Sequence, residues 1–207
     1  DETTLNATRD VWVGSAGSGA TLTASRSIRS LRASQPVDLG STTLNVGSGG
    51  VIATQIQGSA GNHLTAGGSA SAAELFLYSG GTVSANITDN AGPDGQYDAT
   101  PGGALDADNG HVSLVVSLAS NQPLILSGTN TYTGGTFINS GTVEVTAASA
   151  IAPGNLTIRA AGSYSVSGSF AAAFGGIVLS GGGFGSGGDV SASSILIDSG
   201  TLTAARL

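Results

Sequence analysis

Short alternating stretches separated by glycine-containing turns recur along this chain and constrain its fold more than any other feature. In each stretch apolar residues alternate with serine and threonine, as a β-strand with one buried face requires. The stretches span residues 43–54, 75–86, 136–147, 156–167, 177–188 and 195–206. Their matching apolar positions are Leu44, Leu75, Phe137, Leu156, Ile177 and Ile195, and the last four recur at a nearly constant interval. The pattern predicts an all-β fold, a right-handed parallel β-solenoid with about 18–21 residues per rung.

Composition favours the same fold. The chain has 207 residues, 34 of them glycine, with 40% apolar and 5% aromatic residues, so its core is built from small aliphatic side chains. Glycine supplies the positive φ that tight corners need. A rung cannot bury its own apolar face, so stability must come from stacking. We expect eight residues to point inward as stacked columns: Val143, Val145, Leu156, Ile158, Ile177, Leu179, Ile195 and Ile197.

One segment carries a family resemblance. Residues 126–156 read LSGTNTYTGGTFINSGTVEVTAASAIAPGNL. This segment resembles the autotransporter-associated β-strand repeat of bacterial passenger proteins, and residues 27–54 resemble the rungs that precede it. The resemblance implies a β-solenoid that is secreted and displayed at the surface of a bacterium after removal of a targeting segment. Absence of Met from the sequence fits either a processed protein or a piece of a longer one.

Residues 89–110, DNAGPDGQYDATPGGALDADNG, interrupt the period and predict a loop inserted into a single domain of residues 1–207. The loop holds five of the ten aspartates. Ca²⁺ takes six to eight oxygen ligands, and residues 106–110 have the opening of a calcium loop without its closing glutamate. The candidate calcium ligands are Asp94, Asp98, Asp106, Asp108 and Asn109. The other interpretation is a solvated loop, because Asp, Asn and Gly favour turns.

The sequence offers few residues suited to nucleic-acid binding, metal binding or catalysis. Lys and Cys are absent, and the net charge of −7 argues against nucleic acid as a partner. No apolar run approaches the ~20 residues of a membrane span. His63 and His111 have no metal ligand at suitable spacing, and residues 181–190 lack the aspartate of a calcium-binding nonapeptide. We therefore expect no catalytic site and no cofactor.

The two ends predict self-association. Four of the six arginines, Arg9, Arg26, Arg29 and Arg32, lie near the N-terminus. Surface charge that aids solubility is one interpretation, and a basic end that meets an acidic surface on a neighbouring molecule is the other. A strand pattern that includes Leu202 runs to Leu207 without a cap, and uncapped strand edges invite pairing. We expect a non-catalytic structural building block for adhesion or filaments that joins end to end.

Two alternatives stay open. The chain is a segment of a longer adhesin passenger, or it is a glycan-binding or glycan-cleaving module. A glycan module needs an aromatic platform or a carboxylate groove. The sequence does not place its candidate aromatic residues, Trp12, Tyr78, Tyr97, Tyr132 and Tyr164, on one face.

Overall fold

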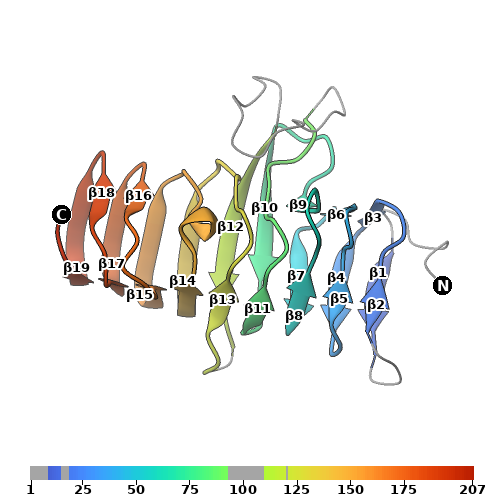
Figure 1. The fold of residues 1–207 in the computed structure, drawn as a ribbon, viewed down its shortest axis with the longest axis horizontal. Helices are drawn as coiled ribbons and strands as arrows, with labels where there is room; N and C mark the ends of the chain where they lie inside the picture. The colour runs from blue at the N-terminus through green and yellow to red at the C-terminus, as the bar shows by residue number, and fades with distance from the viewer. Residues whose placement is uncertain (1–8, 15–18, 93–109, 120) are drawn as a thin grey trace.

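The structure, a computed structural model, describes residues 9–14, 19–92, 110–119 and 121–207. The chain forms a parallel β-solenoid of about nine turns, which confirms the predicted fold class. Strands lie side by side along the long axis, from the N-terminus at one end to the C-terminus at the other (Figure 1). Among the described residues, helical structure is limited to the 3-10 turn η2 (Ala148–Ala150).

The strands of the solenoid lie on three faces. The first face contains β1 (Asp10–Val13), β4 (Ser30–Ala33), β7 (Gly50–Ala53), β10 (Ala72–Leu77) and β12 (His111–Ser117). The second contains β2 (Ala20–Thr21), β5 (Val37–Asp38), β8 (Gln55–Gln57), β11 (Gly81–Val83) and β13 (Leu124–Leu126). The third contains β3 (Arg26–Ile28), β6 (Thr43–Val46), β9 (His63–Ala66), and later β16 (Ala172–Phe174) and β18 (Val190–Ala192).

In the C-terminal half the first two faces are joined by long strands. These are β14 (Thr136–Val145), β15 (Leu156–Val166), β17 (Ile177–Ser186) and β19 (Ile195–Thr203). Their register shifts near the corner, as between Ile138 and Ser140 of β14. Gly141 and Gly200 sit just past this bend with φ of +84° and +112°, a conformation that strains other residues. Glycine therefore lets one strand cover two faces.

The rung length is confirmed where the sequence is regular. Thr136 pairs with Leu156, Leu156 with Ile177 and Ile177 with Ile195, so each pairing advances the chain by one predicted rung. Two predicted alignments are wrong. Phe137 pairs with Thr157 on the outer side, so the inward partner of Leu156 is Thr136. Leu44 belongs to the third face, where it pairs with Leu64 rather than lying in the Leu75 column.

Six of the eight predicted core residues are buried, each with no exposed side-chain surface: Val143, Val145, Leu156, Ile158, Ile177 and Leu179. The other two, Ile195 and Ile197, continue the predicted inward columns but are 39% and 48% exposed. Their register is right, because Ile195 continues the Ile177 column and Ile197 the Leu179 column. They are exposed because β19 pairs on one side only, with β17.

The predicted insertion overlaps the body of the solenoid at both ends. Asp89, Asn90, Ala91 and Gly92 are buried, and Asn90 forms an antiparallel bridge with Gly110. Residues 93–109 lie outside the described part of the chain. The first four residues of the predicted loop therefore belong to the solenoid, and Asn90 lies next to Gly110.

Candidate functional site

The described residues contain no group of three or more His, Cys, Asp or Glu side chains able to hold a metal ion. All five candidate calcium ligands, Asp94, Asp98, Asp106, Asp108 and Asn109, lie outside the described residues, as does Tyr97. His63 is half-buried, with Nδ1 3.3 Å from Thr88 Oγ1, and burial lowers its pKa. His111 is exposed and its Nδ1 lies 2.5 Å from Thr133 Oγ1. Neither histidine therefore adds a ligand to a described metal site.

Asp89 has a structural role. Its Oδ1 accepts hydrogen bonds from the backbone N–H of Val112 at 2.7 Å and of Thr133 at 2.9 Å. Its Oδ2 accepts a third bond from Thr133 Oγ1 at 2.7 Å. A buried carboxylate requires such partners. Asp89 thus joins the start of the insertion to the two rungs that follow it.

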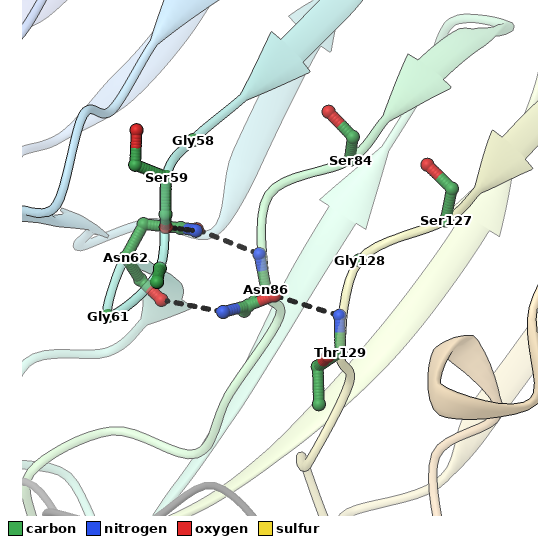
Figure 2. A pocket seen from close by; sticks show the side chains of 10 residues that line it. Gly58, Ser59, Gly61, Asn62, Ser84, Asn86, Ser127, Gly128 and Thr129 are labelled. Atoms are coloured by element: carbon green, nitrogen blue, oxygen red, sulfur yellow. Dashed lines mark hydrogen bonds between the residues drawn. The ribbon is translucent and has the colours of Figure 1, made fainter.

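A polar groove crosses three rungs at the corner between the second and third faces. It has a volume of about 330 Å³ and is lined by Gly58, Ser59, Ala60, Gly61, Asn62, Ser84, Asn86, Ser127, Gly128 and Thr129. Figure 2 shows its asparagines arranged as a ladder. Asn62 Oδ1 accepts the N–H of Asn86 at 2.8 Å, and Asn86 Oδ1 accepts the N–H of Thr129 at 2.8 Å. These amide oxygens replace strand pairing where the backbone turns a corner.

The ladder continues inside the body at Asn130, which is 4% exposed. Its Oδ1 accepts the N–H of Ile87 at 3.0 Å, and its Nδ2 donates to Ala150 O at 2.8 Å. Asn90 Nδ2 likewise donates to Ala66 O at 2.9 Å. Each of these amides is committed to backbone groups of neighbouring rungs. The groove is therefore a structural seam, and its serines have no described acid–base partner of the kind that activates a nucleophile.

The outside of the first face carries a second hollow of about 490 Å³, lined by Asp10, Val11, Trp12, Ser30, Leu31, Arg32, Gly50, Ile52 and Tyr78. Trp12 pairs with Arg32, and Arg32 pairs with Ile52. Tyr78 follows Leu77, the partner of Val51, and so extends the same outward row. We call Trp12, Arg32, Ile52 and Tyr78 the outer row. The sequence prediction did not place these aromatic residues together, although Trp12, Arg32 and Ile52 recur at one rung length along the chain.

The two other tyrosines in the described residues lie in the core. Tyr132 is 1% exposed and its hydroxyl lies 2.6 Å from Thr136 Oγ1. Tyr164 is 3% exposed and its ring stacks on Phe184, with centroids 5.8 Å apart. Burial raises the pKa of both hydroxyls well above their ordinary value. They are packing residues and contribute nothing to a surface platform.

The predicted self-association residues are divided between the two ends. Arg29 forms an ion pair with Asp10, and its Nε donates to Asp10 Oδ1 at 2.8 Å. This contact lowers the pKa of Asp10 well below its usual range. Arg26 is half-buried in β3, and Arg32 is exposed in the outer row. At the other end Leu202 is half-buried and Leu207 is 69% exposed. The basic end is thus partly neutralised within the chain itself.

Comparison with known proteins adds one finding. Residues 124–145 match the family model described as the passenger-associated-transport-repeat. No curated protein and no solved structure matches the chain. In the part of the chain that the structure describes, no helix could cross a membrane. The matched residues comprise β13 and β14 and make about one turn of the solenoid, since Leu124 pairs with Val143, and they confirm the resemblance seen in the sequence. The chain therefore carries a passenger-associated-transport-repeat within a longer β-solenoid.

Proposed function

We propose that this chain is a rigid, non-catalytic structural segment of a secreted bacterial surface protein of the passenger type. The observation that supports this most is the unbroken parallel stack from β1 to β19, with the matched repeat inside it. Such a stack has one continuous core and a fixed axis, which suit a spacer. At about 4.8 Å per rung, nine rungs make a rod of about 45 Å.

The location follows from the kind of repeat rather than from the geometry. Antibodies raised against the chain should label intact, unpermeabilised cells of the producing bacterium. Labelling only after permeabilisation would contradict a surface role. Negative-stain images of the purified chain should show rods of uniform width, and globular particles would contradict a spacer.

We further propose that β19 is covered by the N-terminal rung of a second copy. Ile195, Ile197 and Leu202 continue the inner columns of β17 and leave an apolar end surface. The free edge of β19 offers unpaired backbone groups, a known route for strand addition. A contact of this kind is held mainly by strand pairing and apolar burial, with charge setting orientation.

Sedimentation velocity at rising concentration tests the end-to-end contact. Ile197→Asp should abolish it, because the charge would be buried in the joint, whereas Thr201→Asp on the outer side of β19 is the matched control. The assembly should persist in 1 M salt, where the Debye length is only about 3 Å. A chain that stays monomeric at high concentration would overturn the end-to-end contact and leave the spacer function standing.

A further inference from the structure

Exposed large apolar side chains are confined to two places in the described residues. Ile195, Leu196, Ile197 and Leu207 lie on β19 or at the C-terminus. The remaining three are Trp12 at 70% exposure, Ile52 at 47% and Tyr78 at 40%, all in the outer row. Exposed apolar clusters of this kind mark interaction sites when they are concentrated rather than scattered. The outer row is therefore the feature of the solenoid wall that the spacer role leaves unexplained.

The hollow beside the outer row results from Gly50, a glycine that the backbone conformation does not require. Asp10, Ser30, Gly50 and Phe76 form the neighbouring outward row. A Cβ on Gly50 would meet its nearest atoms at 3.7 and 3.9 Å, which is ordinary contact. The preceding Gly49 differs, because it has φ of +73° and its Cβ would lie 1.8 Å from Glu74 O. Gly50 thus leaves open space between Ser30 and Phe76 that an alanine would occupy without strain.

The rings of Trp12 and Tyr78 each lie against a neighbouring residue. A Cβ on Gly14 would lie 3.3–3.5 Å from three atoms of the Trp12 indole, so this ring covers Gly14. Tyr78 stacks on Phe76 with centroids 6.0 Å apart and an interplanar angle of 4°. Tyr78 and Trp12 therefore present ring surface at the two ends of the row, three rungs or about 14 Å apart.

The charge along the outer row that is not already paired is positive. Asp10 is engaged by Arg29 and accepts a 2.6 Å hydrogen bond from Ser30 Oγ. Arg32, between Trp12 and Ile52, forms no ion pair with any described residue. A guanidinium offers paired donors that match a carboxylate. The row thus alternates ring, cation and apolar surface, although the chain as a whole has a net charge of −7.

We propose that the outer row binds an acidic polysaccharide, with sugar rings lying on Trp12 and Tyr78 and a uronate carboxylate on Arg32. Sugar rings combine an apolar C–H face, which suits an aromatic surface, with hydroxyl edges, which suit Ser30 and the Asp10 carboxylate. A linear polymer can follow the row along the solenoid axis. A protein partner fits less well, because nine residues line the hollow, against roughly 20–30 per side in a stable protein interface.

Trp12 is the sole tryptophan of the chain, so its fluorescence reports on this site directly. The full chain is titrated with polygalacturonate and with its methyl ester, which keeps the rings and removes the charge. Polygalacturonate should shield Trp12 from acrylamide quenching, and the ester should bind about tenfold more weakly. Added salt should weaken binding of polygalacturonate and leave binding of the ester unchanged, since the contact of the uronate carboxylate with Arg32 is exposed.

Variants test which residues contribute to binding of the polymer, and affinity electrophoresis measures that binding. Trp12→Ala and Tyr78→Ala should each weaken binding about tenfold, a factor equivalent to about 1.4 kcal/mol. Arg32→Gln should weaken binding of polygalacturonate and leave the ester unchanged. The matched controls are Leu196→Ala, which removes an exposed apolar side chain of the same face, and Arg159→Gln, which removes an exposed charge elsewhere.

Three results would overturn the proposal: no change in Trp12 quenching with polygalacturonate, equal binding of the ester, or equal losses in the control variants. Shielding of Trp12 by concentrated Ile197→Asp protein, which cannot make the end-to-end contact, would identify the row as a protein contact and would also contradict the proposal. Release of new reducing ends from the polymer would contradict the non-catalytic role without affecting the binding site.

Discussion

At the scale of single residues, buried polar groups link rungs whose backbones cannot pair. Asn130 holds Ile87 and Ala150 together, and Asp89 holds Val112 and Thr133. Both side chains are almost fully buried, so their loss leaves backbone groups without partners. A buried donor or acceptor left unsatisfied costs about 1–3 kcal/mol.

We predict that Asn130→Ala lowers the free energy of unfolding by about 2–4 kcal/mol, because one N–H and one C=O lose their partner. Asn139→Ala is the matched control, since the Asn139 amide contacts a half-exposed side chain, Ser117 Oγ, at 3.1 Å. Its effect should stay within about 0.5 kcal/mol. Urea denaturation followed by circular dichroism measures both. Equal losses would show that the ladder is not a structural seam.

The buried tyrosines predict alkaline instability. Burial raises the pKa of Tyr132 and Tyr164 in the folded state, whereas an unfolded tyrosine titrates near pH ~10. Above that pH the unfolded chain releases protons that the folded chain keeps, so stability falls as pH rises. The loss per tyrosine is at most about 1.4 kcal/mol per pH unit.

Tyr164→Phe should therefore reduce the slope of stability against pH above pH ~10 and leave the slope near neutrality unchanged. The measurement is the free energy of unfolding in urea at several pH values. Identical slopes for the two proteins would mean that Tyr164 ionises in the folded state as readily as in the unfolded chain.

At the scale of strands, adjacent glycines have different roles. Gly49 is required by its positive φ and by its approach to Glu74 O, whereas Gly50 is not. We predict that Gly49→Ala destabilises the fold by about 1–3 kcal/mol or more. Gly50→Ala should be neutral or slightly stabilising, because it restricts the unfolded chain. Thermal unfolding of the two variants tests this, and a large loss for Gly50→Ala would contradict the open hollow beside it.

The insertion provides another prediction at this scale. Asn90 N donates to Gly110 O at 3.2 Å, so the two sides of the segment already meet. Joining Gly92 directly to Gly110 would leave Ala91 and Gly92 as a two-residue turn, a length typical of hairpins. Deletion of residues 93–109 should therefore preserve the β-sheet circular dichroism. Loss of that signal would show that the segment is integral to the fold.

The strands also show what the sequence could predict. The even steps from Thr136 to Leu156, Ile177 and Ile195 are visible as a repeat, because nothing is inserted there. The steps from Val51 to Leu77 and from Leu75 to Leu114 are longer, because each includes extra chain between rungs. Sequence spacing alone cannot align such rungs, so Tyr78 could not be placed beside Ile52. Phe137 was misplaced by one position, which in a strand exchanges the inner and outer sides.

The candidate sites were less predictable than the fold. The predicted calcium ligands lie outside the described residues and stay a prediction. In the sequence the asparagine ladder is visible only as polar residues near the rung corners. Such residues also occur in ordinary turns, so they do not predict a ladder. The burial of Ile195 and Ile197 depends on a neighbouring rung, which local sequence does not report.

At the scale of the whole molecule, the cost of a substitution depends on its rung. Ile158, Leu179 and Ile197 occupy one inner column, and Ile158 is fully buried whereas Ile197 is 48% exposed. Ile158→Asp should lower the free energy of unfolding by several kcal/mol. Ile197→Asp should cost far less in the dilute monomer, since water reaches its carboxylate. Denaturation of both variants at low concentration measures the difference, and equal costs would mean that β19 is covered even in the monomer.

The parallel stack also determines how the molecule responds to force. Backbone hydrogen bonds between rungs point along the rod, so tension applied to its two ends loads one rung at a time. A rung of about 20 residues that detaches adds about 70 Å of extended chain in place of about 5 Å of rod. Stretching should therefore proceed by repeated, similar steps that each dissipate energy. A segment that is stiff at rest would thus lengthen under load and keep its attachment.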